Sequence, residues 1–371
     1  MSILICLIGG QQAPNLFSVL RCSPERIILV HTEDSRDEAD RLRSFLKSRQ
    51  VEQIQLFKVD PYHPRLIHQA AEQLKQQLGS REIILNYTGG TKPIAIGFYE
   101  VFRSNQLVYV DTQTETFWWG EADRLKEEPI DLKPDLPELL HLEGADIRSV
   151  EDHNRLLEFK DLTEYLYRVR RDNLEANEKL KLFNQHAVAA RVENDPHSWK
   201  PDYDDGRLRV QEIDPQKIEV SFDGHRFEMK KKDSWLTYFT GGWFEQWVYH
   251  RLYDTGEYDD VRCNITFRSE NTSRDGLNTK NEIDVAAIRN GIPVFVECKT
   301  GGVQQSHITN LYAVKQHYGS TYTLPVMVML QPRVDRVLQE KMRDYGIRLI
   351  RGGDNLETEF DQLHDEIVIG K

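Results

Sequence analysis

Asp284, Glu297 and Lys299 interrupt two apolar runs that otherwise have the composition of buried β-strands. They lie within residues 281–300, which read NEIDVAAIRNGIPVFVECKT. Carboxylate oxygens are the ligands that Mg²⁺ and Mn²⁺ prefer, and a lysine ammonium stabilises charge on a phosphate under attack. If the fold brings the three side chains together, the chemistry they indicate is metal-dependent hydrolysis of a phosphodiester bond.

A hairpin is the element that must position them. Asn290-Gly291 separates the two β-rich runs, and these residues favour a type I′ turn because both of its central positions need positive φ. Counting outward from a two-residue turn gives the pairs Arg289 with Ile292, Val285 with Val296, Asp284 with Glu297, and Glu282 with Lys299. Because side chains alternate along a strand, the four residues of the last two pairs then share one face of the sheet.

Two carboxylates that face each other across an antiparallel pair repel, so they need a compensating cation. Mn²⁺ or Mg²⁺ would supply one, held by Asp284, Glu297 and the backbone carbonyl of Cys298. Lys299 is then placed either to position or deprotonate a metal-bound water, or to stabilise charge on the phosphate. The alternative is an exposed sheet face with a local ion pair, which leaves the opposed acids uncompensated.

The elements around this hairpin resemble the core of the PD-(D/E)XK nuclease superfamily. In the last third of the chain the pattern predicts helix, strand, strand, strand, helix and strand. The motif residues are Asp284 and, after the hairpin, Glu297 and Lys299, with Glu245 on the preceding helix. Ile283 stands where the family name has proline. The resemblance implies a nuclease with Glu245, Asp284, Glu297 and Lys299 as catalytic residues. For Glu245 the competing interpretation is a solvated helix glutamate.

The chain after Glu297 is locally basic and carries three tyrosines, a combination that can hold a nucleic-acid backbone and stack bases. Ordinary solvated helices carry the same residue types, so scattered surface charge is an equal alternative. The residues concerned are Lys315, Arg333, Arg336, Lys341, Arg343, Arg348, Arg351, Tyr312, Tyr318 and Tyr345.

Short apolar runs alternate with helical patterns over the first 120 residues. Near-continuous apolar strands separated by helices predict a doubly wound, mostly parallel sheet, which is a Rossmann-like domain. The expected strands are 3–8, 26–32, 53–59, 82–88 and 106–112, and the expected helices lie near 14–20, 35–48, 63–79 and 91–104. With the usual strand order 3-2-1-4-5, the first and fourth strands flank the switch point where such folds bind ligands.

Two polar, glycine-rich loops follow those two strands. Residues 9–12 read GGQQ, and residues 86–92 read NYTGGTK. The glycines let the backbone approach a ligand, Thr91 can cap the next helix, and the free N–H groups at its start favour an anion. The spacing matches neither the P-loop nor the dinucleotide fingerprint. The residues alone predict a phosphate or nucleotide site, with a pair of ordinary tight turns as the alternative.

The second loop also resembles the CARF domain, the CRISPR-associated Rossmann-like sensor of cyclic oligoadenylate. Asn86, Thr88 and Lys92 meet its pattern of Asn or Asp, then Ser or Thr two residues on, then Lys or Arg four further. The resemblance implies activator contacts at Gly10, Gln11, Gln12, Asn86, Thr88, Gly89, Gly90, Thr91 and Lys92.

A CARF domain followed by a PD-(D/E)XK module makes the whole chain resemble the ancillary nucleases of type III CRISPR systems. The resemblance implies a homodimer whose CARF pair binds a cyclic oligoadenylate, with cyclic tetra-adenylate favoured, and switches on cleavage of DNA, RNA or both. One alternative is a ring nuclease that degrades the activator in the N-terminal domain, with Thr88, Thr91 or Lys92 assisting attack by a ribose 2′-hydroxyl. Another is a ligand-responsive nucleic-acid-binding protein with an inactive nuclease fold.

Composition sets the outer limits of the prediction. At 371 residues and 39% hydrophobic, the chain is long enough for two domains with separate cores. We expect a CARF domain at 1–125, a connecting region of helices and strands at 126–232, and a nuclease domain at 233–371. The net charge of −12 argues against a protein that coats nucleic acid by bulk electrostatics but permits a local basic groove. Four scattered cysteines and the lack of a signal-like or membrane-spanning run predict reduced thiols in the cytoplasm, with no membrane partner.

Overall fold

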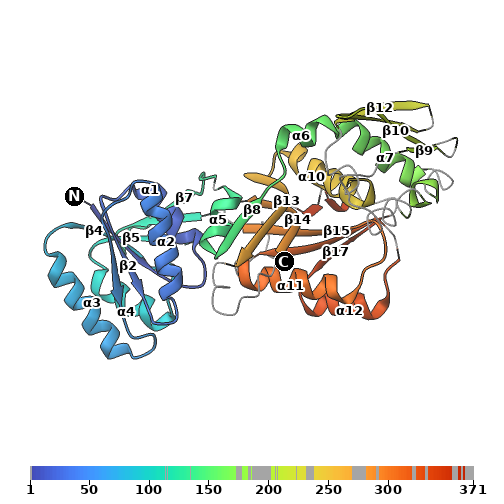
Figure 1. Ribbon diagram of the computed structural model, residues 1–371. Helices are drawn as coiled ribbons and strands as arrows, with labels where there is room; N and C mark the ends of the chain where they lie inside the picture. Colours follow the sequence, from blue (N-terminus) through green and yellow to red (C-terminus); the bar gives the residue numbers. More distant parts are fainter. Residues whose placement is uncertain are drawn as a thin grey trace.

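Two α/β domains make up the structure, and the connecting region packs on the second of them (Figure 1). The computed structural model describes residues 2–112, 114, 116–133, 135–172, 178–182, 185, 202–204, 206, 208–222, 224–230, 238–269, 281–289, 292–319, 323–330, 333–352, 358–360, 362 and 363. None of the helices in these ranges is long and apolar enough to cross a membrane. All four cysteines are free thiols, and three of them are buried.

The first domain is the predicted doubly wound sheet, with strand order β3-β2-β1-β4-β5-β6-β7. The parallel strands are β1 (Ser2–Leu7), β2 (Arg26–His31), β3 (Ile54–Lys58), β4 (Glu82–Asn86) and β5 (Gln106–Asp111). Strands β1 and β4 are neighbours, which confirms the predicted switch point. Two further antiparallel strands extend the sheet, and the second of them lies past the expected boundary at residue 125. They are β6 (Thr116–Gly120) and β7 (Lys126–Pro129).

Helices cover both faces of this sheet, because its strands are apolar on both sides. The buried residues of α1 and α2 belong to one core, and those of α3 and α4 to another. The four helices are α1 (Ala13–Cys22), α2 (Arg36–Ser48), α3 (Pro64–Leu78) and α4 (Lys92–Phe102). Each predicted strand and helix of this domain is therefore confirmed, with bounds that differ by a few residues at most.

The second domain is a six-stranded mixed sheet with order β17-β16-β15-β14-β13-β8. Its elements follow the predicted order of helix, three strands, helix and strand. They are α10 (Trp243–Thr255), β13 (Asp260–Ser269), β14 (Asn281–Arg289), β15 (Ile292–Lys299), α11 (Gln305–Tyr318) and β16 (Leu324–Met329), then α12 (Arg336–Asp344) and β17 (Arg348–Arg351). Helix α10 shares a core with alternate residues of β14 and β15, whereas α11 and α12 pack on the other face.

The connecting region is built onto helix α10 instead of forming a separate linker. The Tyr167 ring stacks on that of Trp247 with centroids 3.8 Å apart, and the His250 ring nitrogen Nε2 lies 3.1 Å from the Leu156 carbonyl oxygen. Its four strands form a separate sheet of order β12-β11-β10-β9. The elements are α6 (His153–Glu158), α7 (Lys160–Asp172), β9 (Asp202–Asp204), β10 (Leu208–Asp214), β11 (Lys217–Phe222) and β12 (His225–Lys230), followed by a π-type turn, η1 (Tyr238–Gly242).

One short segment joins the two domains. Helix α5 (Leu136–Leu142) lies against α2 of the first domain, where Arg41 Nε donates to the Leu142 carbonyl at 3.1 Å. The N–H at the start of the same helix, on Leu136, donates to the Asp260 carboxylate at 3.0 Å. Strand β8 (Ala145–Ser149) then adds to the edge of the second sheet beside β13. The sequence pattern did not predict this strand, which belongs to the second sheet although it lies in the expected connecting region.

Candidate active site and ligand site

The hairpin has the predicted register near its turn. Arg289 pairs with Ile292, and Val285 pairs with Val296. Residues 290–291, the predicted turn, lie outside the described residues. The ladder ends at the Val285–Val296 pair, so the strands part just before the charged residues begin.

Beyond the end of the ladder, contacts of the charged side chains connect the two strands. The Asp284 carboxylate accepts the backbone N–H of Cys298 at 2.8 Å, a donor that a ladder carbonyl would take in a longer hairpin. Lys299 Nζ lies 2.6 Å from Glu297 Oε1 and 3.7 Å from Asp284 Oδ2, and it donates to the Cys298 carbonyl at 3.1 Å. The predicted backbone pairs Asp284 with Glu297 and Glu282 with Lys299 are thus absent from the ladder, yet the side chains still converge.

Burial dominates the electrostatics of this cluster. Asp284 is 8% exposed, and burial together with the charge of Glu297 raises its pKa to about 7, although Lys299 and the Cys298 N–H act in the opposite direction. Burial lowers the pKa of Lys299, but the two carboxylates outweigh it and raise that pKa to about 12. The cation that compensates the acids in this structure is therefore the Lys299 ammonium, as in the ion-pair alternative, but Asp284 is buried and not on an exposed face.

Glu245 belongs to the same cluster, although its helix covers the other face of the sheet. Burial raises its pKa well above the usual value, and the negative charges of Asp284, Glu282 and Glu297 add to that shift while Lys299 opposes it. A glutamate on the solvated side of α10 would feel none of these charges. The structure therefore disagrees with the interpretation of Glu245 as a solvated helix residue.

A cavity of about 660 Å³ opens on the charged face of the hairpin. Glu282, Asp284, Glu297 and Lys299 line it from the sheet, and Asn310 and His317 line it from α11. The sequence argument did not select Asn310 or His317, but their spacing of seven residues places them on one face of a helix. The opening is large enough to admit part of a nucleic-acid chain.

The oxygen atoms around Lys299 Nζ fit a small divalent cation. Two carboxylates and one carbonyl converge on a single position, and Mg²⁺ commonly takes one or two carboxylates with water completing its shell. In the part of the chain that the structure describes, no group of three or more His, Cys, Asp or Glu side chains could hold a metal ion. An ion in place of the Lys299 ammonium would meet two carboxylates, those of Asp284 and Glu297, and the Cys298 carbonyl.

The three tyrosines of the basic segment that follows Glu297 pack on other aromatic rings of the domain. The Tyr312 ring stacks on that of Tyr345 at 4.3 Å between centroids, and Tyr318 packs edge-on against Phe267. Three tyrosines that pack on neighbours within the domain are not open platforms for bases. The role of the basic residues of this segment in holding a nucleic-acid backbone stays a prediction.

In the first domain, the two glycine-rich loops meet as predicted. A Cβ added at Gly89 would lie 2.1 Å from the Leu7 carbonyl oxygen, and one at Gly9 would lie 2.9 Å from the Gly90 nitrogen. Only glycine permits this approach. Thr91 caps α4 by accepting the N–H of Ile94, so the start of that helix faces the same crevice.

The loop side chains divide into exposed and buried sets. Gly10 and Lys92 are exposed, and Gln11, Thr88, Gly89, Gly90 and Thr91 are partly buried. Asn86 is fully buried, where it donates to the Asn15 side-chain oxygen at 3.1 Å and accepts the Thr88 N–H at 3.1 Å. Gln12 is 1% exposed and donates to the Gly9 carbonyl at 2.8 Å. Asn86 and Gln12 therefore position the loops in this structure, and their direct contact with an activator stays a prediction.

The fold and the two sites define a nuclease-type α/β domain joined to a Rossmann-like sensor domain. The family comparison makes this specific: residues 3–127 match the Card1 CARF domain, and residues 233–368 match the Card1-like endonuclease domain. The chain therefore combines an N-terminal CARF domain of the Card1 type with a C-terminal Card1-like endonuclease domain. No curated protein matches the chain.

Solved structures share the fold over nearly the whole chain. Protein VC1899 from Vibrio cholerae has 18% sequence identity and a TM-score of 0.81, over 100% of this chain and 99% of its own. Can2 from Sulfobacillus thermosulfidooxidans, in complex with cyclic tetra-adenylate, has 18% identity and a TM-score of 0.72, over 99% of this chain and 98% of its own. A type III CRISPR defence DNA nuclease activated by cyclic oligoadenylate has 15% identity and a TM-score of 0.58, over 97% of this chain and 52% of its own.

Proposed function

We propose that the protein is a metal-dependent endonuclease, switched on by a cyclic oligoadenylate, that acts in type III CRISPR defence. The observation that carries this proposal is the convergence of Asp284, Glu297 and Lys299 on one cavity, in a chain that also holds a CARF domain. The substrate would be DNA, RNA or both. The cavity accepts a polymer and does not by itself favour either sugar.

The cluster supplies what phosphodiester hydrolysis needs. Asp284, Glu297 and the Cys298 carbonyl would hold Mn²⁺ or Mg²⁺, and such an ion provides Lewis-acid polarisation of the phosphate. Lys299 holds its proton and carries a positive charge beside the place where negative charge develops on the phosphate oxygens. Glu245 adds a buried carboxyl group from the α10 side, and a bound cation would favour its ionised form.

The activator would bind where the two loops meet at the switch point of the first sheet. The N–H groups at the start of α4, the Lys92 side chain and the close-packed glycines suit the phosphates of a cyclic oligonucleotide. Can2, which shares this fold, is bound to cyclic tetra-adenylate, and we carry that activator over as the favoured one.

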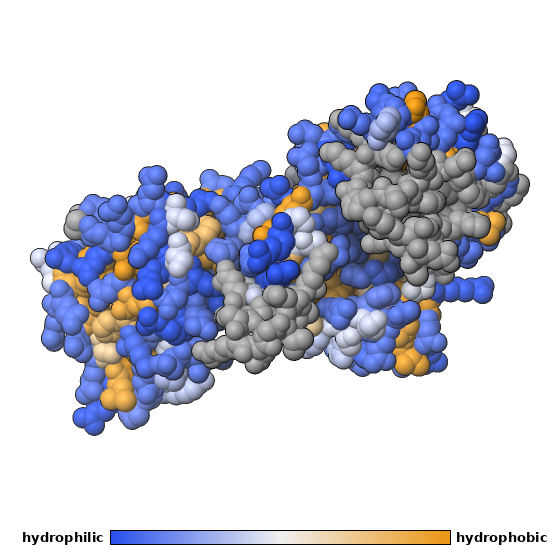
Figure 2. Space-filling model, in the orientation of Figure 1, coloured by the Kyte–Doolittle hydropathy of each residue, from blue (hydrophilic) through white to orange (hydrophobic). Residues whose placement is uncertain are grey.

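A second copy of the chain would complete the activator site. Tyr62, Leu66 and Ile96 are exposed apolar residues at 69%, 47% and 60%, all close to helices α3 and α4. Figure 2 shows hydrophobic surface on the part of this domain where Figure 1 places those helices. A two-fold symmetric ligand favours an isologous interface, which presents the same loops twice. We therefore propose a homodimer through the CARF domains.

Segment α5–β8 would carry the signal between the domains. Glu143, at the end of α5, contacts the backbone of loop 9–12, and β8 is part of the nuclease sheet. Across that sheet, Ser149 of β8 pairs with Thr266 of β13, which pairs with Glu282 of β14. A movement of the loop thus has a continuous route to the charged end of β14.

The test is cleavage of labelled single-stranded and supercoiled substrates, with cyclic tri-, tetra- or hexa-adenylate and with Mg²⁺ or Mn²⁺. We expect cleavage only when an activator and a metal ion are both present, and none by Glu297→Ala. Cleavage of equal rate without any activator would contradict the switch. Activator loss that persists in a variant lacking Glu297 and Lys299 would assign ring-nuclease activity to the first domain.

A further inference from the structure

A second cavity, of about 260 Å³, lies beside the charged cluster. Arg170, Lys181 and Gln185 line it from the connecting region, and Trp243, Thr300 and Gly301 line it from the nuclease domain. We call it the Arg170 pocket. It brings the two parts of the chain together at the end of β15.

The chain itself places this pocket next to the catalytic residues. Thr300 and Gly301 follow Lys299 directly, and Trp243 precedes Glu245 by two residues. Consecutive Cα atoms are about 3.8 Å apart, so the pocket begins within one nucleotide's reach of the Lys299 backbone. A nucleic-acid strand that presents one phosphate to the cluster therefore has a neighbouring phosphate available for this pocket.

The charges that line the pocket are positive. Arg170 and Lys181 contribute them, and no carboxylate is among the lining residues that the structure describes. Burial lowers the pKa of Arg170 while the charge of nearby Glu178 raises it, so the guanidinium stands partly removed from water. In the part of the chain that the structure describes, it makes no hydrogen bond or salt bridge. Lys181 is paired with Glu178 at 2.5 Å, a contact one turn along the same helix.

Two features of the walls suit a phosphate. Trp243 is 1% exposed, and its indole N–H is buried without a hydrogen-bond partner among the described residues. Such a buried donor costs free energy unless a ligand or water accepts its hydrogen. At Gly301, an added Cβ would meet nothing within 4 Å, so its backbone is open to close approach.

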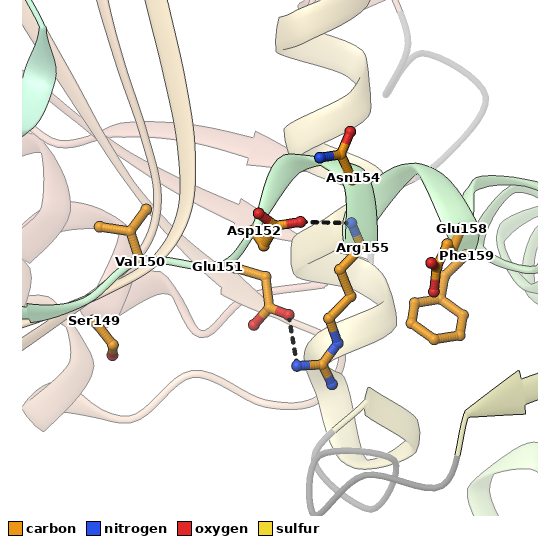
Figure 3. Close-up of a pocket in the computed structure, with 8 residues that line it drawn as sticks. All are labelled: Ser149, Val150, Glu151, Asp152, Asn154, Arg155, Glu158 and Phe159. Carbon is orange, nitrogen blue, oxygen red and sulfur yellow. Dashed lines mark hydrogen bonds and ion pairs between the residues drawn. The ribbon is translucent and has the colours of Figure 1, made fainter. Parts of the chain in front are cut away.

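Another pocket shows that a basic lining is not general here. A cavity of about 440 Å³ lies where β8 leads into α6, and Glu151, Asp152 and Glu158 line it (Figure 3). Its arginine, Arg155, points toward Glu151, with 3.1 Å between the guanidinium and the carboxylate (Figure 3). This acidic lining would repel a polyanion.

We propose that the Arg170 pocket binds the backbone phosphate next to the scissile one, so the connecting region forms part of the substrate site. Arg170 and Lys181 hold the phosphate oxygens, and the Trp243 N–H donates to the bound group. This inference rests on the proposed nuclease function. It assigns a substrate-binding role to Arg170 and Lys181, which neither matched domain includes, since the matches end at 127 and resume at 233.

The test compares R170Q/K181Q with R168Q/K179Q. The control pair removes the same charge from the same two helices at residues that do not line the pocket. The probe is a labelled single-stranded 12-mer, titrated by anisotropy with cyclic tetra-adenylate present and with Ca²⁺ replacing Mg²⁺ and Mn²⁺. We expect R170Q/K181Q to bind about tenfold more weakly than wild type. The slope of log affinity against log salt should fall by about one. The control pair should stay within about twofold, and the unfolding midpoints should match.

A scan with single neutral methylphosphonates then locates the contact. One position next to the cleaved bond should weaken binding to wild type and leave R170Q/K181Q unaffected. If the variant and the control bind alike, or if every substituted position costs both proteins equally, the pocket does not hold a phosphate. Failure of the wild type to bind or cleave any nucleic acid would instead overturn the nuclease proposal, so the two failures are distinct.

Discussion

The backbone N–H of Gln12 donates a hydrogen bond to the Glu143 carboxylate at 3.3 Å, although the two residues are 131 positions apart in the chain. Gln12 ends the loop after β1, and Glu143 directly follows helix α5, just before the strand that joins the nuclease sheet. A small cavity beside Glu143 is lined by Ala13 of the first domain and by Pro293 and Tyr318 of the second. The loop, the joining segment and the nuclease domain thus meet at one place.

Glu143→Ala should weaken activation while leaving the active site intact. Removal of this carboxylate frees the Gln12 loop from α5, and couplings between sites are typically about 1–3 kcal/mol. We expect activator-dependent cleavage to fall by about tenfold, with little change in cleavage measured without activator. Glu138→Ala is the control, because Glu138 lies on the same helix and pairs with Arg49 instead of the loop. Equal activation in Glu143→Ala and wild type would exclude this route.

The same carboxylate predicts a dependence of stability on pH. Burial raises the pKa of Glu143 from 4.5 to about 7, with Glu38 adding to the shift and the Gln12 N–H and Arg41 opposing it. The phenol of Tyr318 is the other titratable group beside it. At a pH between 4.5 and about 7, the Glu143 carboxyl group of the folded state holds a proton that the unfolded chain has released. Stability therefore falls as pH rises from about 4.5 to about 7 and is level above that range.

Glu143→Gln should remove this part of the pH dependence. At pH 5 the variant and the wild type should unfold alike, and at pH 8 the variant should be the more stable by roughly 1–3 kcal/mol. Urea unfolding at several pH values measures the difference. Other titrating groups, Asp284 among them, are common to both proteins and cancel. Parallel pH profiles for the two proteins would show that Glu143 is ionised throughout.

Variants of the charged cluster should separate catalytic from merely acidic residues. Glu297→Gln and Asp284→Asn remove oxygens that converge on the Lys299 position, and we expect cleavage to fall by about a thousandfold. Glu245→Gln should lose about tenfold, since its buried carboxyl group would carry a negative charge beside the cluster only when a metal ion is bound. Glu282→Gln is the matched control, because Glu282 lines the same cavity but is exposed. A Glu297→Gln protein that cuts at the wild-type rate would remove this site from consideration.

Most helices and strands could be predicted from the local sequence pattern, and the elements that were not predicted have physical explanations. Apolar runs and helical periods gave the first sheet, its strand order and the nuclease core because those elements bury continuous surfaces. Strand β8 was not predicted because its sequence, ADIRS, has few apolar residues. It is a strand only because it pairs with β13. The charged side chains converge as expected, yet the ladder stops before them, since the Asp284 carboxylate takes the N–H that would continue it.

The directions in which the side chains of the two sites point were harder to predict from the sequence than their positions in the chain. Asn86 fits the family pattern by position, but its amide groups are used by Asn15 and Thr88 inside the domain. Asn310 and His317 are ordinary polar helix residues in the sequence, and only the packing of α11 on the sheet brings them to the cavity. Glu245 came from the resemblance, and its buried, charge-coupled position comes from the structure.

Gly89→Ala tests whether the two loops need their close approach. The new Cβ would lie 2.1 Å from the Leu7 carbonyl oxygen, which belongs to the buried strand β1 and cannot move aside. We expect a loss of stability of about 1–3 kcal/mol, as for other overpacked sites. Gly10→Ala is the control, because a Cβ there meets nothing within 4 Å, and its effect should stay within about 0.5 kcal/mol.

Thermal and urea unfolding of the two alanine variants compare their free energies of unfolding directly. The two substitutions add the same methyl group, one on each of the two loops. If Gly89→Ala is as stable as Gly10→Ala, the loop after β4 can withdraw from β1 at little cost. The crevice would then be formed by the ligand instead of standing ready for it. If Gly89→Ala alone is destabilised, the contact between Gly89 and Leu7 holds the two loops together before any activator binds.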